Sequence, residues 1–221
     1  MIHILGAPRT GSTLMYQLVI NFFHVNYFAN NGTIRNTDDM PVPYVSEFGK
    51  TQDAHEPSEA SYVLKRWFGE DKDTCPHKRT EMMNICEYHK PLVFKNVWNI
   101  YRVDEWVHLF PDVQFIWIQR DVQDAAASDL KARKETGCGL NNAYRKFSER
   151  DLSNLPEHVQ VFEQQRDMNK TIEVGLANKS FIQIWYNDLC TQTRWELSRL
   201  QRFLNAEYRD REIPKLIAHV R

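Results

Sequence analysis

The stretch ILGAPRTGSTLMYQLV, residues 4–19, joins two apolar segments through a turn that contains glycine. Residues 2–6 have the composition of a short buried strand, and residues 12–23 are apolar on nearly every face, which is typical of a buried helix. Between them, Gly6 and Gly11 are spaced as in the phosphate-binding pattern G-x-x-x-x-G-K-[ST], but a serine replaces the lysine. The stretch predicts a strand, a loop and a helix, and it leaves open which anion the loop binds.

The loop can be interpreted either as an anion-binding site or as an ordinary connection between a strand and a helix. Backbone N–H groups at a turn and at a helix start can point at an anion, and the helix dipole favours negative charge there. Arg9 supplies the cation of the loop, and an Arg fork suits an oxyanion held at two oxygens. Alternatively, the segment is a plain strand–turn–helix junction with Ser12 or Thr13 as the helix cap.

The rest of the chain alternates between strand and helix patterns. Strands are expected at 91–95, 113–119 and 180–186. Helices are expected at 58–68, 79–89, 99–109, 121–134, 140–150, 157–178 and 193–204. Such alternation predicts a three-layer α/β fold with a mostly parallel central sheet and helices on both faces. No linker divides the chain, so residues 1–221 are expected to form a single domain, with a long irregular stretch at 29–57.

Composition excludes several classes of function. The net charge is −1, so no overall basic surface for nucleic acid is expected. No apolar run approaches the roughly 20 residues of a membrane span, and no export signal is apparent. The cysteines form no C-x-x-C pair, which favours free thiols and a cytoplasmic location. Zinc ligation by Cys75, His77, Cys86 and His89 is an alternative, but the spacing lacks the usual knuckle and no metal is expected.

A second segment, FIWIQRDVQDAAASDLKAR at 115–133, adds polar side chains after the best strand of the sequence. Arg120 stands at the carboxyl end of this strand, and Ser128 follows eight residues later on the next helix. Ligands of open α/β sheets bind outside the carboxyl ends of strands, so Arg120 is placed to meet an anion. Asp121 is expected to cap the helix, although a magnesium ligand of a Walker B strand would stand at a similar place.

Together, PRTGST at 8–13 and the pattern R-D-x-x-D-x-x-x-S at 120–128 resemble the sulfotransferases that use 3′-phosphoadenosine 5′-phosphosulfate. The resemblance implies that the first loop holds the 5′-phosphosulfate and the second motif holds the 3′-phosphate. An arginine would then take the place of the P-loop lysine. The residues implied for the first site are Arg9, Thr10, Gly11, Ser12 and Thr13, and those for the second are Arg120 and Ser128.

Two longer stretches are similar to the same family. In residues 91–121, Lys95 matches a lysine that the family places near the transferring sulfuryl group, and residues 182–204 resemble a later strand and helix of the family. The resemblance implies that Arg9 and Lys95 clamp the transferring group, that the acceptor offers a hydroxyl or an amine, and that the product is adenosine 3′,5′-bisphosphate. No metal is expected, because the phosphate is already a good leaving group.

The general base is not fixed by a motif. Val97 stands where the cytosolic branch of the family has a catalytic histidine, and residues 205–221 lack that branch's R-K-G segment. HEPSEASY at 55–62 resembles the G-E-P-x-E segment that carries the base in a trehalose-sulfating branch, which makes Glu59 the first candidate and Glu56 the second. Either glutamate could instead be a first-turn carboxylate of the helix expected there.

Two other functions remain open at this point. One is a P-loop-like kinase or nucleotidase that uses a triphosphate and magnesium, although the missing loop lysine argues against it. The other is a nucleotide-binding module without catalysis, which the lack of a clear base permits. The sequence does not identify the acceptor or the oligomeric state, and we expect the acceptor-binding and lid residues to lie within 29–90.

Overall fold

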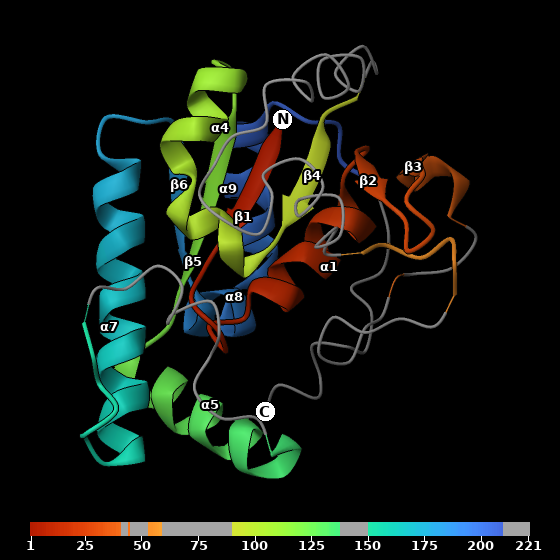
Figure 1. Cartoon of the computed structure of the whole chain (residues 1–221). Coiled ribbons are helices and arrows are strands. Elements are labelled where there is room, and N and C mark those ends of the chain that lie inside the picture. The colour runs from red at the N-terminus through yellow and green to blue at the C-terminus, as the bar shows by residue number, and fades with distance from the viewer. Residues whose placement is uncertain (41–43, 45–52, 59–89, 138–149, 210–221) are drawn as a thin grey trace.

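The structure is a computed structural model, and it describes residues 1–40, 44, 53–58, 90–137 and 150–209 (Figure 1). The elements of the described residues follow in chain order: β1 (Ile2–Leu5), α1 (Ser12–Phe22), β2 (Asn26–Phe28), β3 (Ile34–Asn36), η1 (Thr37–Asp39), β4 (Leu92–Lys95), η3 (Val97–Tyr101), α4 (Val103–Leu109), β5 (Gln114–Gln119), α5 (Val122–Thr136), α7 (Glu157–Leu176), β6 (Phe181–Trp185), α8 (Tyr186–Thr191) and α9 (Thr193–Leu204).

The strands form one six-stranded sheet in the order β3-β2-β4-β1-β5-β6, with β1 near its middle. Every pair is parallel except β2 with β3. In β1, Ile4 lies opposite Lys95 of β4 on one side and Ile116 of β5 on the other, so the carboxyl ends of the three strands meet at one edge. This edge is where parallel sheets bind ligands.

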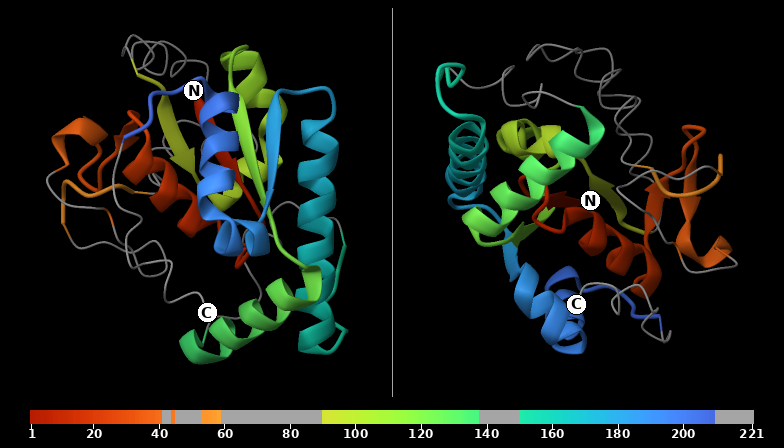
Figure 2. Two further views of the ribbon diagram at one scale, coloured as in Figure 1. Left: turned by 180° about the vertical axis from the view of Figure 1, so that it is seen from behind. Right: turned by 90° about the horizontal axis from the view of Figure 1, so that it is seen from below.

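Helices cover both faces of the sheet, and the period of two along the strands explains why (Figures 1 and 2). In β5, Ile116 and Ile118 belong to the hydrophobic cluster under α1, α8 and α9. Phe115 and Trp117 point the other way, into the cluster under η3, α4 and α7. The fold is therefore the three-layer α/β fold with a mostly parallel sheet that the sequence predicts, and it begins with the predicted strand, loop and helix.

Some predicted elements differ from the structure. The helix expected at 99–109 is two pieces, because the backbone at Arg102 (φ −129°, ψ 19°) separates η3 from α4. Residues 29–57 are not wholly irregular, since β3 and η1 lie within them, and β2 and α8 were not predicted. The helices expected at 58–68, 79–89 and 140–150 fall almost entirely outside the described residues. Among the helices that are described, none has the length and apolarity needed to cross a bilayer.

Candidate active site

The loop between β1 and α1 has a tight, left-handed backbone. Arg9 has φ 65° and Gly11, the N-cap of α1, has φ 95°. A Cβ atom on Gly11 would lie 2.4 Å from Cδ2 of Tyr186, and one on Gly6 would lie 2.6 Å from Oγ1 of Thr10. Both positions therefore require glycine because neighbouring side chains approach the backbone closely.

Side chains from three parts of the chain hold this loop. The carbonyl oxygen of Ala7 accepts a hydrogen bond from Thr10 Oγ1 at 2.8 Å. The next carbonyl, that of Pro8, accepts from Gln165 Nε2 at 2.9 Å, and that of Arg9 accepts from Arg120 Nη1 at 3.4 Å. The first N–H groups of α1 have no partner within the helix, and its first turn contains no acidic side chain. These contacts hold the loop backbone in place, and the first N–H groups of α1 are available to bind an anion.

Arg120 directly follows β5 and lies at the same edge of the sheet. Its guanidinium carbon is 4.8 Å from the centroid of the Tyr186 ring, within the range of a cation–π contact. Its Nε atom is buried and has no hydrogen-bond partner among the described residues. Asp121 caps α5 by accepting the N–H groups of Gln123 and Asp124 at 2.9 and 3.1 Å, which confirms the expected capping role.

The two sequence motifs contact each other directly. Arg9 Nε donates to Ser128 Oγ at 3.2 Å, although the two residues are 119 positions apart in the chain. Arg9, Arg120 and Ser128 thus form one cluster at the carboxyl ends of β1 and β5. The side chain of Arg9 extends toward the residue predicted for the 3′-phosphate, so a single cation is within reach of both predicted anion sites.

Lys95 is the last residue of β4 and is only 8% exposed. Its position opposite Ile4 puts it beside the end of β1, where the loop begins. After it, Asn96 caps η3 by accepting the N–H of Trp98 at 2.8 Å, so the chain turns away from the sheet at once. Lys95 therefore lies at the same edge as the loop and Arg120.

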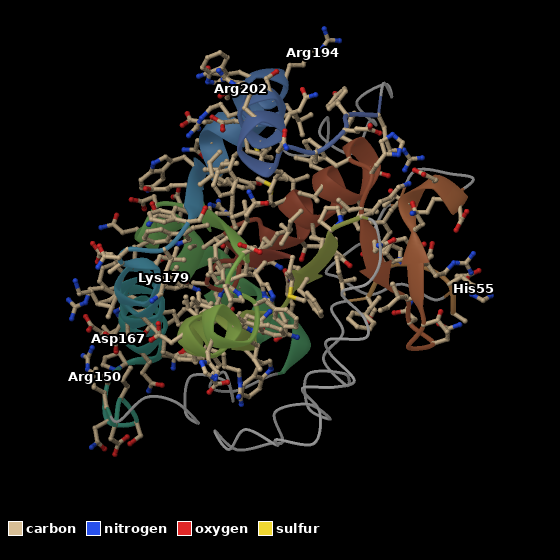
Figure 3. All side chains as sticks on the ribbon, turned by 90° about the horizontal axis from the view of Figure 1, so that it is seen from above. His55, Arg150, Asp167, Lys179, Arg194 and Arg202 are labelled. Atoms are coloured by element: carbon tan, nitrogen blue, oxygen red, sulfur yellow. The ribbon has the colours of Figure 1, made fainter. Side chains whose placement is uncertain are left out.

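The structure places one of the two predicted bases. Glu56 lies beyond the carboxyl end of β2, where its carbonyl accepts the N–H of Asn30 at 3.0 Å. Its carboxylate accepts the N–H of Asp53 at 3.4 Å and so supports a local turn. Glu59 lies outside the described residues. His55 is exposed and points away from the sheet (Figure 3).

The residues considered above as an alternative zinc site, Cys75, His77, Cys86 and His89, also lie outside the described residues. Within the part of the chain that is described, no group of three His, Cys, Asp or Glu residues could hold a metal ion.

Tyr186 is a residue of the site that the sequence analysis did not identify. It stands in the motif WYNDL at 185–189, and its ring packs against Gly11 and Arg120. Burial raises the pKa of Tyr186, and Cys190 adds to this shift, while Arg120 and Arg9 oppose it. The phenol is thus neutral near pH 7 and offers both a ring surface and an O–H donor.

Gln165 is a second such residue. It stands in the middle of a charged helix pattern, and nothing in that pattern distinguishes it from its neighbours. Only the folded chain shows that it contacts the loop.

Comparisons with known proteins identify a family and a fold. The family model described as the sulfotransferase family matches residues 2–210. A similar solved structure is the sulfotransferase domain from the curacin biosynthetic pathway, with 22% identity, 98% of this chain and 76% of that chain covered, and a TM-score of 0.53. Another is a sulfotransferase from Mycobacterium tuberculosis, with 14% identity, 100% and 71% coverage, and a TM-score of 0.60.

A third is the sulfotransferase domain of the Synechococcus olefin synthase, with 14% identity, 98% and 75% coverage, and a TM-score of 0.54. At these identities the likeness shows the fold. No curated protein sequence matches the chain significantly.

Proposed function

Because this chain belongs to the sulfotransferase family, we propose that it transfers the sulfuryl group of 3′-phosphoadenosine 5′-phosphosulfate to a hydroxyl or an amine of an acceptor. The observation that carries the proposal is the cluster of Arg9, Ser128 and Arg120, which joins two sequence motifs at the binding edge of the sheet. A donor with one anionic group at each end of its ribose matches a site with two adjoining cationic positions.

The residues present fit such a donor. Arg9, Thr10, Gly11, Ser12 and Thr13 would hold the 5′-phosphosulfate, and Arg120 and Ser128 would hold the 3′-phosphate. The buried Nε of Arg120 supports this assignment, because a buried charged donor without an acceptor costs free energy that an anionic oxygen would offset. Ser128 accepts a hydrogen bond from Arg9, so both side chains face one position.

The donor supplies a sulfuryl group on a good phosphate leaving group. The chain's own residues then need to position the acceptor and stabilise charge, by analogy with phosphoryl transfer. Arg9 and the nearly buried Lys95 would neutralise oxygens whose charge changes as the bond from sulfur to the phosphate oxygen breaks. Glu59 or Glu56 would take the proton of the acceptor as the new bond to sulfur forms. The acceptor contacts are proposed to lie within 29–90.

Thermal unfolding with three nucleotides tests this proposal. We expect adenosine 3′,5′-bisphosphate to stabilise the protein more than AMP or ATP with magnesium does. At a hundredfold excess over its Kd, the bisphosphate should add about 2.7 kcal/mol to the free energy of unfolding of the protein without nucleotide. If ATP with magnesium stabilises the protein and the other two nucleotides do not, the result would favour a kinase or nucleotidase. Equal responses to AMP and the bisphosphate would contradict the proposed 3′-phosphate site. Transfer of radiolabelled sulfate to candidate alcohols and amines then tests catalysis.

A further inference from the structure

We infer that Gln165, on the inner face of α7, is a positioning residue that orients the donor-binding loop for the transfer proposed above. Its Nε2 donates to the carbonyl oxygen of Pro8 at 2.9 Å across 157 residues of sequence. The side chain is only 1% exposed. The orientation of its amide is fixed by the partner, since a carbonyl oxygen can only accept a hydrogen bond.

This contact sets the direction of a backbone donor. The peptide bond between Pro8 and Arg9 is planar and trans, so the carbonyl of Pro8 and the N–H of Arg9 point in opposite directions. With the carbonyl held toward α7 by Gln165, the N–H of Arg9 points away from α7. Arg9 also has φ 65°, a conformation that residues other than glycine rarely adopt, so its neighbours must hold it there.

The residue before Gln165, Gln164, contacts the second sequence segment, at 115–133. Gln164 Oε1 accepts from Arg133 Nη2 at 2.7 Å, and the same nitrogen donates to Asp129 at 2.8 Å. Arg133 and Asp129 are buried on α5, and Asp129 is adjacent to Ser128. Since Ser128 accepts from Arg9, the contacts form a closed ring through the loop, α7 and α5. Adjacent glutamines of α7 therefore fix both halves of the proposed donor site.

The location of these amides favours a positioning role over simple packing. Apart from Gln164 and Gln165, the buried residues of α7 are apolar, and they include Val161, Met168 and Ile172. Its outer side carries ion pairs such as that of Arg150 with Asp167, which point at each other in Figure 3. A buried amide costs free energy unless it is hydrogen-bonded, so an apolar residue would suffice at position 165 if only packing were needed.

The test compares two glutamines of the same helix. Gln165→Met keeps the length and most of the volume of the side chain and removes the donor to the loop. Gln160→Met is the matched control, because Gln160 Nε2 also donates to a backbone carbonyl, that of Leu155 at 2.6 Å, outside the donor site. The measurements are the Kd of adenosine 3′,5′-bisphosphate, by titration, and amide hydrogen exchange of the ligand-free protein at residues 6–14.

We expect Gln165→Met to raise the Kd about tenfold, as loss of one hydrogen bond to a binding loop implies, and to speed exchange at 6–14. Gln160→Met should change neither. An unchanged Kd and unchanged loop exchange in Gln165→Met overturn the inference, as does a lower Tm with the Kd preserved. If Gln165→Met does not fold, Gln165→Asn, whose shorter amide does not span the same distance, gives the same comparison.

The two proposals can fail separately. If the unmodified protein does not bind the bisphosphate, the proposed function fails, and the exchange measurement alone decides whether Gln165 holds the loop. If the bisphosphate binds and Gln165→Met behaves like the control, only the positioning role is refuted.

Discussion

The substitution Arg120→Ala tests the proposed 3′-phosphate site most directly. Arg120 lies at the carboxyl end of β5, donates to the carbonyl of Arg9 at 3.4 Å and covers the Tyr186 ring at 4.8 Å. Its Nε is buried without a partner among the described residues, so it is a donor ready for an anion. Alanine removes this donor and its charge without adding bulk.

The expected effect follows from the chemistry of the contact. A hydrogen bond to a charged group contributes about 1.5–3 kcal/mol, which corresponds to roughly 12- to 140-fold in Kd. This loss applies to adenosine 3′,5′-bisphosphate but not to AMP, which has no 3′-phosphate. The loss of the cation–π contact with Tyr186, about 0.5–1 kcal/mol, affects both nucleotides alike. The ratio of the two Kd values should therefore collapse toward one.

Calorimetric titration of both nucleotides measures this ratio. Arg202→Ala is the matched control, because Arg202 also lies over an aromatic ring, that of Trp195 at 5.7 Å, but on the exposed side of α9 (Figure 3). The control should keep the ratio of the unmodified protein. If Arg120→Ala still prefers the bisphosphate by the original factor, Arg120 does not bind the 3′-phosphate.

Other substitutions test the remaining assignments. Lys95→Ala should lower turnover by about 10²–10³-fold while the bisphosphate still binds, and unchanged steady-state rates would remove Lys95 from the mechanism. Of Glu59→Gln and Glu56→Gln, the variant at the true base should lose about 10²–10⁴-fold in turnover with donor affinity preserved, and near-normal rates in both would place the base elsewhere. Gly11→Ala would force alanine to adopt φ 95° and would place its Cβ 2.4 Å from the ring of Tyr186. We therefore expect the free energy of unfolding to fall by about 2 kcal/mol or more and the Tm to fall by about 4–8 °C. Gly137→Ala is its control, because Gly137 has φ 66° and a Cβ there would have no atom of the described residues within 4 Å. An equal drop in both Tm values would refute the role of the clash.

Much of the fold could be predicted because it depends on local patterns. The strands at β1, β4, β5 and β6 and the helix α9 match the expected segments closely, since their apolar residues recur with the period of a strand or a helix. β2 and β3 were not predicted, because three residues are too few to show a period. The break at Arg102 was also not predicted, since the pattern across 99–109 continues through it.

The candidate site shows the same division. Arg120 and Ser128 could be proposed because they follow a strong strand at a recognisable spacing, and Gly6 and Gly11 because turns need glycine. Gln165 could not, because its partner is 157 residues away and the surrounding sequence contains several similar polar residues. The roles of all these residues in binding and transfer stay predictions until the substitutions are measured.

Local sequence patterns were sufficient to predict the α/β class, the strand–loop–helix at the start of the chain and the resemblance to the sulfotransferases. These features depend on side-chain periodicity and motif spacing, which operate over a few neighbouring residues. Three further features became visible only in the folded chain: Arg9 donates to Ser128, Tyr186 limits position 11 to glycine, and Gln165 of α7 holds the loop. Those contacts arise because parallel strands bring their carboxyl ends to one edge, where residues far apart in the chain come within hydrogen-bonding distance.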